Sequence, residues 1–97
     1  MHEHGLAREL WPQLKALADE KQLTKVTRVE MIVGMLHGVS ADFLAHSFEH
    51  AFEGTSFEGA VTEITVVDPG DSIPAEGGTS ATATGWELMI TRMEGDS

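Results

Sequence analysis

The spacing of hydrophobic residues in the first 20 positions predicts an amphipathic helix. Four leucines recur at intervals of four, four and three residues, which is the period of a single helix face: Leu6, Leu10, Leu14 and Leu17. Good helix formers fill the positions between them, so we expect a helix over about residues 4–20. Pro12 lies inside this range and removes one backbone donor, which predicts a bend at that point.

The period changes to two residues in the next segment. Over residues 25–35, apolar and charged side chains alternate, as in Val29-Glu30-Met31, which predicts a strand. Ser40 can then cap a second helix, which we expect over residues 41–53. The apolar positions of this helix form one stripe, and Gly54 provides the stop: Leu44, Phe48, Ala51 and Phe52.

The second half of the chain predicts two further strands separated by a long connection. Residues 60–67 are rich in β-branched side chains, and a right-handed crossover would place this strand parallel to the first. Residues 68–84 are rich in Gly, Pro, Ser and Thr without any period, so we expect a flexible loop. Alternation resumes from Trp86 to Ile90, which predicts a returning antiparallel strand, and we expect residues 94–97 to fray.

These elements predict an α+β fold of one domain over residues 1–97, with a three-stranded mixed sheet covered by two helices in the order α-β-α-β-β. A chain of 97 residues is the length of one compact domain, and 41% apolar residues suffice for a modest core. No apolar run approaches the roughly 20 residues that a membrane-spanning helix needs.

The net charge of the chain indicates which kinds of molecule can bind to it. Sixteen acidic residues against six basic ones give a net charge of −10, which repels nucleic acid and anionic lipid. We therefore expect neither a nucleic-acid nor a membrane partner, and favour cations or basic protein surfaces. The lack of cysteine and of a visible secretory signal favours a cytoplasmic location.

The first residues carry the chemistry of a metal chelate. The α-amine of Met1 is one residue from the imidazole of His2, so the two can bind one metal together with an intervening backbone amide nitrogen. Nickel(II) and copper(II) favour such square-planar nitrogen sets. His4 could donate a further nitrogen.

The other histidines are weaker candidates. His37 follows the first strand, and is either a surface turn residue or a ligand that the fold brings near the amino terminus. His46 and His50 are one helical turn apart, a spacing that can chelate a metal from one helix face, although solvated structural histidines are the simpler interpretation. No phosphate loop, nucleophile motif or catalytic pair is visible, so we do not expect an enzyme.

Several short motifs follow one another in a characteristic order. They are His2-Glu3-His4-Gly5-Leu6-Ala7 at the start, Val26-Thr27-Arg28-Val29 in the first strand, Glu58-Gly59-Ala60 after the second helix, and Gly85-Trp86-Glu87-Leu88-Met89-Ile90 near the end. In this order the chain resembles the HypA/HybF family of hydrogenase nickel-insertion accessory proteins. The resemblance covers about residues 1–67 and 85–94.

The resemblance implies a nickel metallochaperone that serves [NiFe]-hydrogenase maturation. It implies that the amino terminus and His2 bind Ni(II) and that Glu3 supports the site. With His4 added from its chemistry, the predicted metal site comprises Met1, His2, Glu3 and His4. The implied partners are the nickel-handling GTPase of the pathway and the hydrogenase large subunit.

The chain departs from the family in one respect. Family members usually carry two CxxC pairs that hold a structural zinc between the second and third strands, whereas this sequence contains no cysteine. We therefore expect no structural zinc, and a loop over residues 68–84 in place of the zinc module. The departure leaves a second function open, a metal-independent interaction module that docks on a maturation GTPase, a hydrogenase subunit or a second copy of itself as a homodimer.

Overall fold

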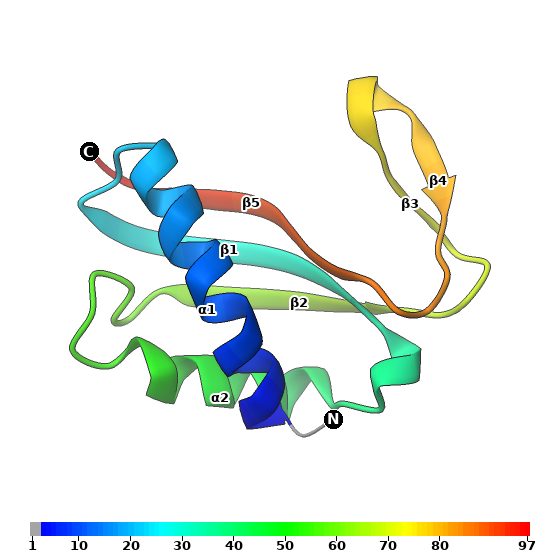
Figure 1. The fold of residues 1–97 in the computed structure, drawn as a ribbon, viewed down its shortest axis with the longest axis horizontal. Coiled ribbons are helices and arrows are strands. Elements are labelled where there is room, and N and C mark those ends of the chain that lie inside the picture. The colour runs from blue at the N-terminus through cyan, green and yellow to red at the C-terminus, as the bar shows by residue number, and fades with distance from the viewer. Residues whose placement is uncertain (1–2) are drawn as a thin grey trace.

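Two helices lie on one face of a three-stranded sheet, and a short hairpin extends from one end of it (Figure 1). The structure is a computed structural model that describes residues 3–97, with side chains described from Gly5 onward. The longer elements are α1 (Glu3–Glu20), β1 (Lys25–Gly34), α2 (Ala41–Phe52), β2 (Val61–Val67) and β5 (Leu88–Asp96). The short ones are η1 (Met35–His37), β3 (Ser72–Pro74), η2 (Glu76–Gly78) and β4 (Ser80–Thr82). The predicted α+β class and the order of its five main elements are confirmed.

The sheet has the order β2-β1-β5, with β1 in the centre. β1 pairs with β2 in parallel and with β5 antiparallel, so the sheet is mixed as predicted. The crossover between the parallel strands contains α2, whose first turn is capped by the Ser40 hydroxyl accepting from the Phe43 backbone N–H at 3.5 Å.

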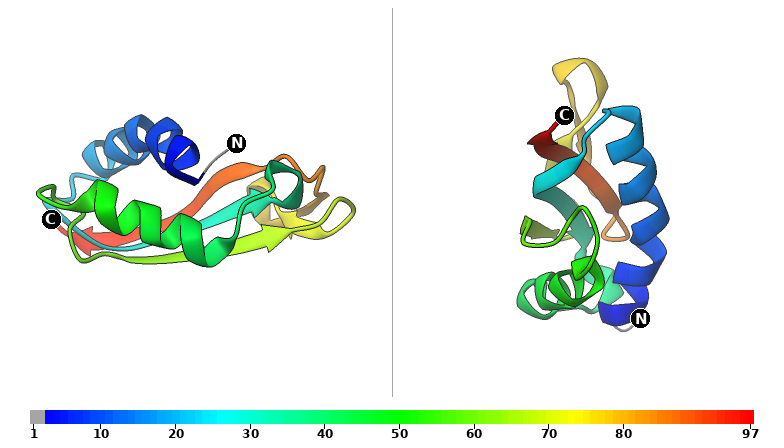
Figure 2. Two further views of the ribbon diagram at one scale, coloured as in Figure 1. Left: turned by 90° about the horizontal axis from the view of Figure 1, so that it is seen from below. Right: turned by 90° about the vertical axis from the view of Figure 1, so that its left-hand side faces the viewer.

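The main core lies between the helices and the inner face of the sheet (Figure 2). Its fully buried large side chains come from both helices, from β1 and from the segment after α2: Leu6, Leu10, Leu14, Val26, Val29, Met31, Val33, Leu44, Phe48, Phe52 and Phe57. The predicted leucine stripe of α1 supplies three of these residues, and the helix continues unbroken on both sides of Pro12.

The segment over residues 68–84 contains regular structure that the sequence pattern did not predict. β3 and β4 pair antiparallel as a two-stranded hairpin, with Ile73 opposite Ala81. Ile73 packs with Ile32 and Val67 in a second, smaller apolar cluster away from the main core. Apolar contacts therefore hold the hairpin to the sheet, and the segment is not the loop without secondary structure that the sequence predicted.

The last strand begins later and ends later than predicted. β5 starts at Leu88, while Trp86 precedes it with 59% of its surface exposed. The expectation that residues 94–97 fray is wrong, because the Thr24 backbone N–H donates to the Asp96 carbonyl at 2.7 Å and β5 runs to Asp96. Gly95 permits this pairing, since a Cβ there would lie 2.0 Å from the Lys25 carbonyl oxygen.

Two phenylalanines on α2 test this assignment of the core. Phe48→Ala should lower the free energy of unfolding by about 3–5 kcal/mol, because Phe48 is fully buried and its removal leaves a cavity. Phe43 is 67% exposed on the same helix, so Phe43→Ala is the matched control and should change stability by no more than about 0.5 kcal/mol. Urea unfolding followed by circular dichroism measures both, and equal losses would contradict the assignment.

Candidate functional site

The predicted metal site lies at the start of α1. Glu3 and His4 form the first turn of this helix, and their side chains are not among those that the structure describes. Met1 and His2 lie outside the described residues altogether. The chelate predicted from these four residues therefore stays a prediction, and what the structure describes is the surface on which α1 begins.

An aromatic cluster fixes the first half of α1 against α2. The ring centroid of Trp11 lies 5.9 Å from that of Phe52 and 5.1 Å from that of Phe57, with an edge-to-face arrangement in the second case. Each such aromatic pair stabilises the fold by about 0.5–1.5 kcal/mol beyond the free energy gained from burying its surface. Leu6 and Ala7 are buried just before Trp11, so the first turns of α1 rest on the core.

A shallow pocket opens between the two helices beside this cluster. It is lined by α1 and α2 residues: Ala7, Arg8, Trp11, Ser47, His50 and Ala51. His50 is the one metal-binding residue type in this lining, and Arg8 is its one cation. The pocket thus places a histidine of α2 opposite residues from the first half of α1.

His37 holds two turns together. Its Nε2 lies 3.0 Å from the Trp86 carbonyl oxygen, and its ring meets the Trp86 indole edge to face at 5.3 Å between centroids. These contacts join η1 to the turn before β5. Of the two interpretations offered for this residue, the surface turn histidine agrees with these contacts.

His46 and His50 are brought together by α2. Their Nε2 atoms lie 3.2 Å apart on the exposed side of the helix. Among the side chains that the structure describes, from Gly5 onward, no group of three or more His, Cys, Asp or Glu is arranged to hold a metal. The pair is therefore the closest approach of two metal-binding nitrogens that the described histidines provide.

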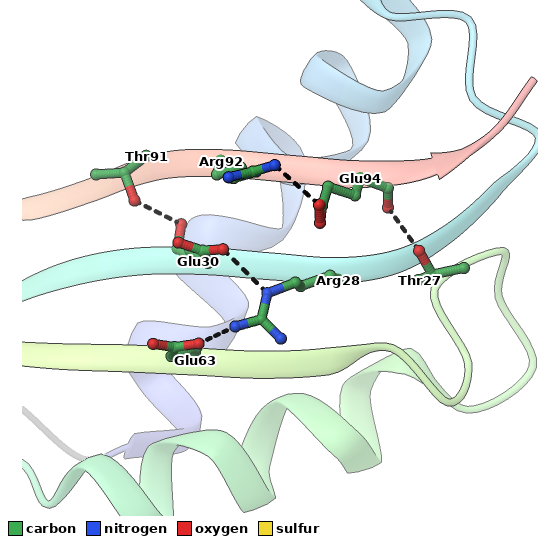
Figure 3. Close-up of polar contacts among 7 residues, drawn as sticks. All are labelled: Thr27, Arg28, Glu30, Glu63, Thr91, Arg92 and Glu94. Carbon is green, nitrogen blue, oxygen red and sulfur yellow. Dashed lines mark hydrogen bonds and ion pairs between the residues drawn. The ribbon is translucent and has the colours of Figure 1, made fainter.

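The outer face of the sheet carries a ladder of charges that crosses all three strands (Figure 3). The Arg28 guanidinium on β1 donates to Glu30 Oε2 at 3.0 Å and to Glu63 on β2, while Arg92 and Glu94 pair on β5 at 3.1 Å. The hydrogen bond to Glu30 and the charge of Glu63 raise the pKa of Arg28 above its usual value. A permanently charged guanidinium moves no proton, so the ladder orders the sheet face and is not acid–base machinery.

A single carboxylate shapes the turn that leads into β5. Glu87 accepts hydrogen bonds from the backbone N–H of Thr84 at 2.7 Å, from that of Gly85 at 2.9 Å and from the Thr84 hydroxyl at 3.1 Å. The bond from the Thr84 backbone lowers the pKa of Glu87 most, and the other donors lower it further. Glu87 thus positions Trp86 against His37.

Comparison with known proteins assigns this fold to a family. Residues 1–70 match the family model described as hydrogenase/urease nickel incorporation, metallochaperone, hypA. The chain belongs to the HypA family. The resemblance found in the sequence motifs is confirmed, and the family's description is that of a metallochaperone, not of an enzyme, as the sequence predicted.

The relatives are hydrogenase maturation factors. The chain is 38% identical over 66 residues to the HypA hydrogenase maturation factor of Prosthecochloris aestuarii, a match that covers 68% of this chain and 58% of that protein. It is also 38% identical over 66 residues to that of Archaeoglobus fulgidus, covering 68% of this chain and 60% of the relative. The matched region thus spans less than two thirds of the relatives' own length.

A solved structure shares the fold across the whole described chain. The solution structure of the Ni metallochaperone HypA from Helicobacter pylori superposes with a TM-score of 0.68, covering 100% of this chain and 99% of that one at 15% sequence identity. At this identity the likeness supports the fold alone. Among the helices that the structure describes, none has the length and apolar character to cross a membrane.

The Glu87 turn generates a pH prediction. Because the pKa of Glu87 is lowered in the folded state, the carboxylate stabilises the fold above the pKa of the unfolded chain, and this stabilisation is lost as pH falls through the lower folded value. Glu87→Gln should therefore be less stable than the parent protein at pH 7, with the difference shrinking below about pH 4. Urea midpoints at pH 7, 5 and 3 measure the difference, and a pH-independent gap would exclude this role of the charge.

Proposed function

We propose that this chain is a nickel metallochaperone that binds Ni(II) at its amino terminus and delivers it during [NiFe]-hydrogenase maturation. The observation that carries the proposal is the match to the HypA family over residues 1–70, which includes the complete Met1-His2-Glu3-His4 motif. The family's description names hydrogenase and urease, and the named relatives are hydrogenase maturation factors, which favours a hydrogenase as recipient.

The proposed chelate uses the α-amine of Met1, the imidazole of His2 and backbone amide nitrogen, with Glu3 in support and His4 as a further donor. α1 begins at Glu3, and the first N–H groups of a helix have no intrahelical partner. Backbone nitrogen can therefore serve as a ligand there without breaking a helical hydrogen bond. The nickel ion is cargo in this scheme and not a resident cofactor, and we expect no structural zinc because the sequence has no cysteine.

The position at a helix start also suits release. The amino-terminal end of a helix carries a partial positive charge, which opposes a bound cation by about 0.3–1 kcal/mol. Glu3 is the first residue of α1, and an acidic residue at this position of a helix offsets part of this term. Because the helix end repels the cation and the acidic residue attracts it, such a site holds nickel less tightly than a site in which protein ligands surround the ion. Weaker binding is what a delivery protein requires.

The partners in this proposal are the nickel-handling GTPase of the pathway and the hydrogenase large subunit, met in the cytoplasm. The net charge of −10 favours basic surfaces on either partner. The alternative is a metal-independent interaction module that docks on the same proteins. The lack of cysteine motivates that alternative, because loss of the zinc-binding residues could accompany loss of metal traffic.

Blocking the α-amine tests the proposed chelate. Titration calorimetry near pH 7.5 should give one saturable Ni(II) equivalent at the amino terminus that disappears when the α-amine is acetylated, because the acetylated nitrogen no longer offers a lone pair to a metal. The affinity should fall as pH drops through the range of the amine and the imidazole, since both must lose a proton to bind. Equal binding at this site with a free and with an acetylated α-amine would exclude the chelate.

Substitution of His2 separates the two functions. If the metallochaperone proposal holds, His2→Ala should abolish nickel-dependent hydrogenase maturation in cells while the purified variant still binds its GTPase partner. The interaction module predicts normal maturation by the same variant. The readouts are hydrogenase activity in a strain that depends on this protein and pull-down of the GTPase.

A further inference from the structure

Two histidines on the exposed side of α2 turn their rings toward each other. The Nε2 atoms of His46 and His50 lie 3.2 Å apart, and the two rings are nearly perpendicular. Their side chains are 62% and 58% exposed, so neither ring is used to fill the core. An ion in solution can therefore reach both nitrogens without any movement of the fold.

Carboxylates on the same helix orient these rings. His50 Nδ1 lies 3.1 Å from Glu53 Oε1, and His46 Nδ1 lies 3.6 Å from Glu49 Oε2. An ionised carboxylate accepts hydrogen bonds and cannot donate them, so Nδ1 of His50 carries the proton, and the nearby charge of Glu49 favours the same tautomer in His46. Each neutral ring then keeps its lone pair on Nε2. A carboxylate on the far nitrogen is the usual companion of a metal-binding histidine.

Two lone pairs that face each other at this distance need positive charge between them. A shared proton can supply it, and so can a metal ion. Imidazole nitrogen binds zinc at about 2.0–2.1 Å, so nitrogens 3.2 Å apart subtend roughly 100° at an ion held equally by both. That angle lies between the about 90° of neighbouring square-planar or octahedral ligands and the about 109° of tetrahedral ones.

We propose that His46 and His50 form a bidentate site for a divalent first-row transition metal, with nickel(II), copper(II) and zinc(II) as the ions that paired imidazoles favour. The two rings fill two adjacent coordination positions, and water or the side chains of a bound partner fill the others. No third described His, Cys, Asp or Glu completes the site, so the ion keeps open positions. The site is independent of the amino-terminal chelate.

The charges around the pair favour a cation. His50 lies in the last turn of α2, where the carbonyl end of the helix carries partial negative charge. Glu49 and Glu53 contribute two carboxylates on the same side of the helix. Arg8 opposes a cation from across the pocket between the helices, and the two carboxylates outweigh this single charge.

The decisive experiment titrates Ni(II) into protein that carries His2→Ala and His4→Ala, so that no histidine remains beside the α-amine and the amino-terminal chelate cannot form. One saturable equivalent should remain, and His46→Ala or His50→Ala should each weaken it at least about tenfold, because a single imidazole loses the advantage of two linked ligands. His37→Ala is the matched control and should bind as the parent does, since its Nε2 already contacts the Trp86 carbonyl.

A second readout locates the ion. Paramagnetic Ni(II) should broaden the ring resonances of His46 and His50 before those of His37, and EDTA should restore them. Ni(II) should also raise the melting temperature of the protein with His2→Ala and His4→Ala, and not that of the same protein with His46→Ala added, because an ion that binds only the folded state stabilises it. Glu53→Gln should weaken binding several-fold, since the amide oxygen still accepts from Nδ1 but carries no charge.

Two results would overturn the site. Binding that is unchanged in both histidine variants would place the ion elsewhere. A protein with His2→Ala and His4→Ala that binds no Ni(II) would show that the histidine pair holds no metal. Because His2→Ala and His4→Ala remove the amino-terminal chelate alone, comparison with the unsubstituted protein separates failure of this site from failure of the proposed nickel function.

Discussion

The pairing of β1 with a strand on either side is the constraint on which the other elements depend. Parallel pairing with β2 requires a crossover, and α2 provides it, while antiparallel pairing with β5 brings the chain back from the hairpin. Alternate side chains of β1 then serve two separate layers. Val29 and Met31 enter the main core beneath the helices, whereas Ile32 joins the smaller cluster that holds the hairpin. A one-residue slip of β1 would exchange these layers and bury Arg28 and Glu30, which makes the register strongly specified.

The length of each element decided whether it could be predicted from the sequence. Long elements such as α1 and β1 were predicted to within one or two residues. In each of them the hydrophobic pattern repeats several times, so many residues indicate the same buried face. The hairpin was missed because strands of three residues show no period, and its position depends on Ile73 meeting Val67 in the folded chain. Trp86 was placed in the last strand by alternation alone, yet hydrogen bonds from Thr84 and Gly85 to Glu87 form a turn that delays the strand to Leu88.

The candidate metal sites also differ in how far the sequence alone could predict them. The spacing of His46 and His50 is visible in the sequence, whereas the approach of their Nε2 atoms depends on the rotamers that Glu49 and Glu53 help to set. His37 could be given two roles from sequence, and only its contact with the Trp86 carbonyl distinguishes them. The motif at the amino terminus was recognisable because a terminal amine beside a histidine is a chelate by covalent connection, whatever the fold does. A site formed by residues adjacent in the sequence can be predicted from the sequence alone. A site that depends on side-chain conformation can be recognised only in a structure.

The arrangement also bears on how a small protein could handle an exchangeable ion. α1 begins on a platform fixed by Trp11, Phe52 and Phe57, and the His46–His50 pair lies on the helix that forms the other wall of the same pocket. The His46–His50 pair does not enclose an ion, because it offers two exposed rings. An ion with open coordination positions can accept a ligand from a partner before it leaves the first protein, so that transfer passes through a shared intermediate and avoids a bare hydrated ion. Exposure of the His46–His50 pair therefore favours delivery over storage.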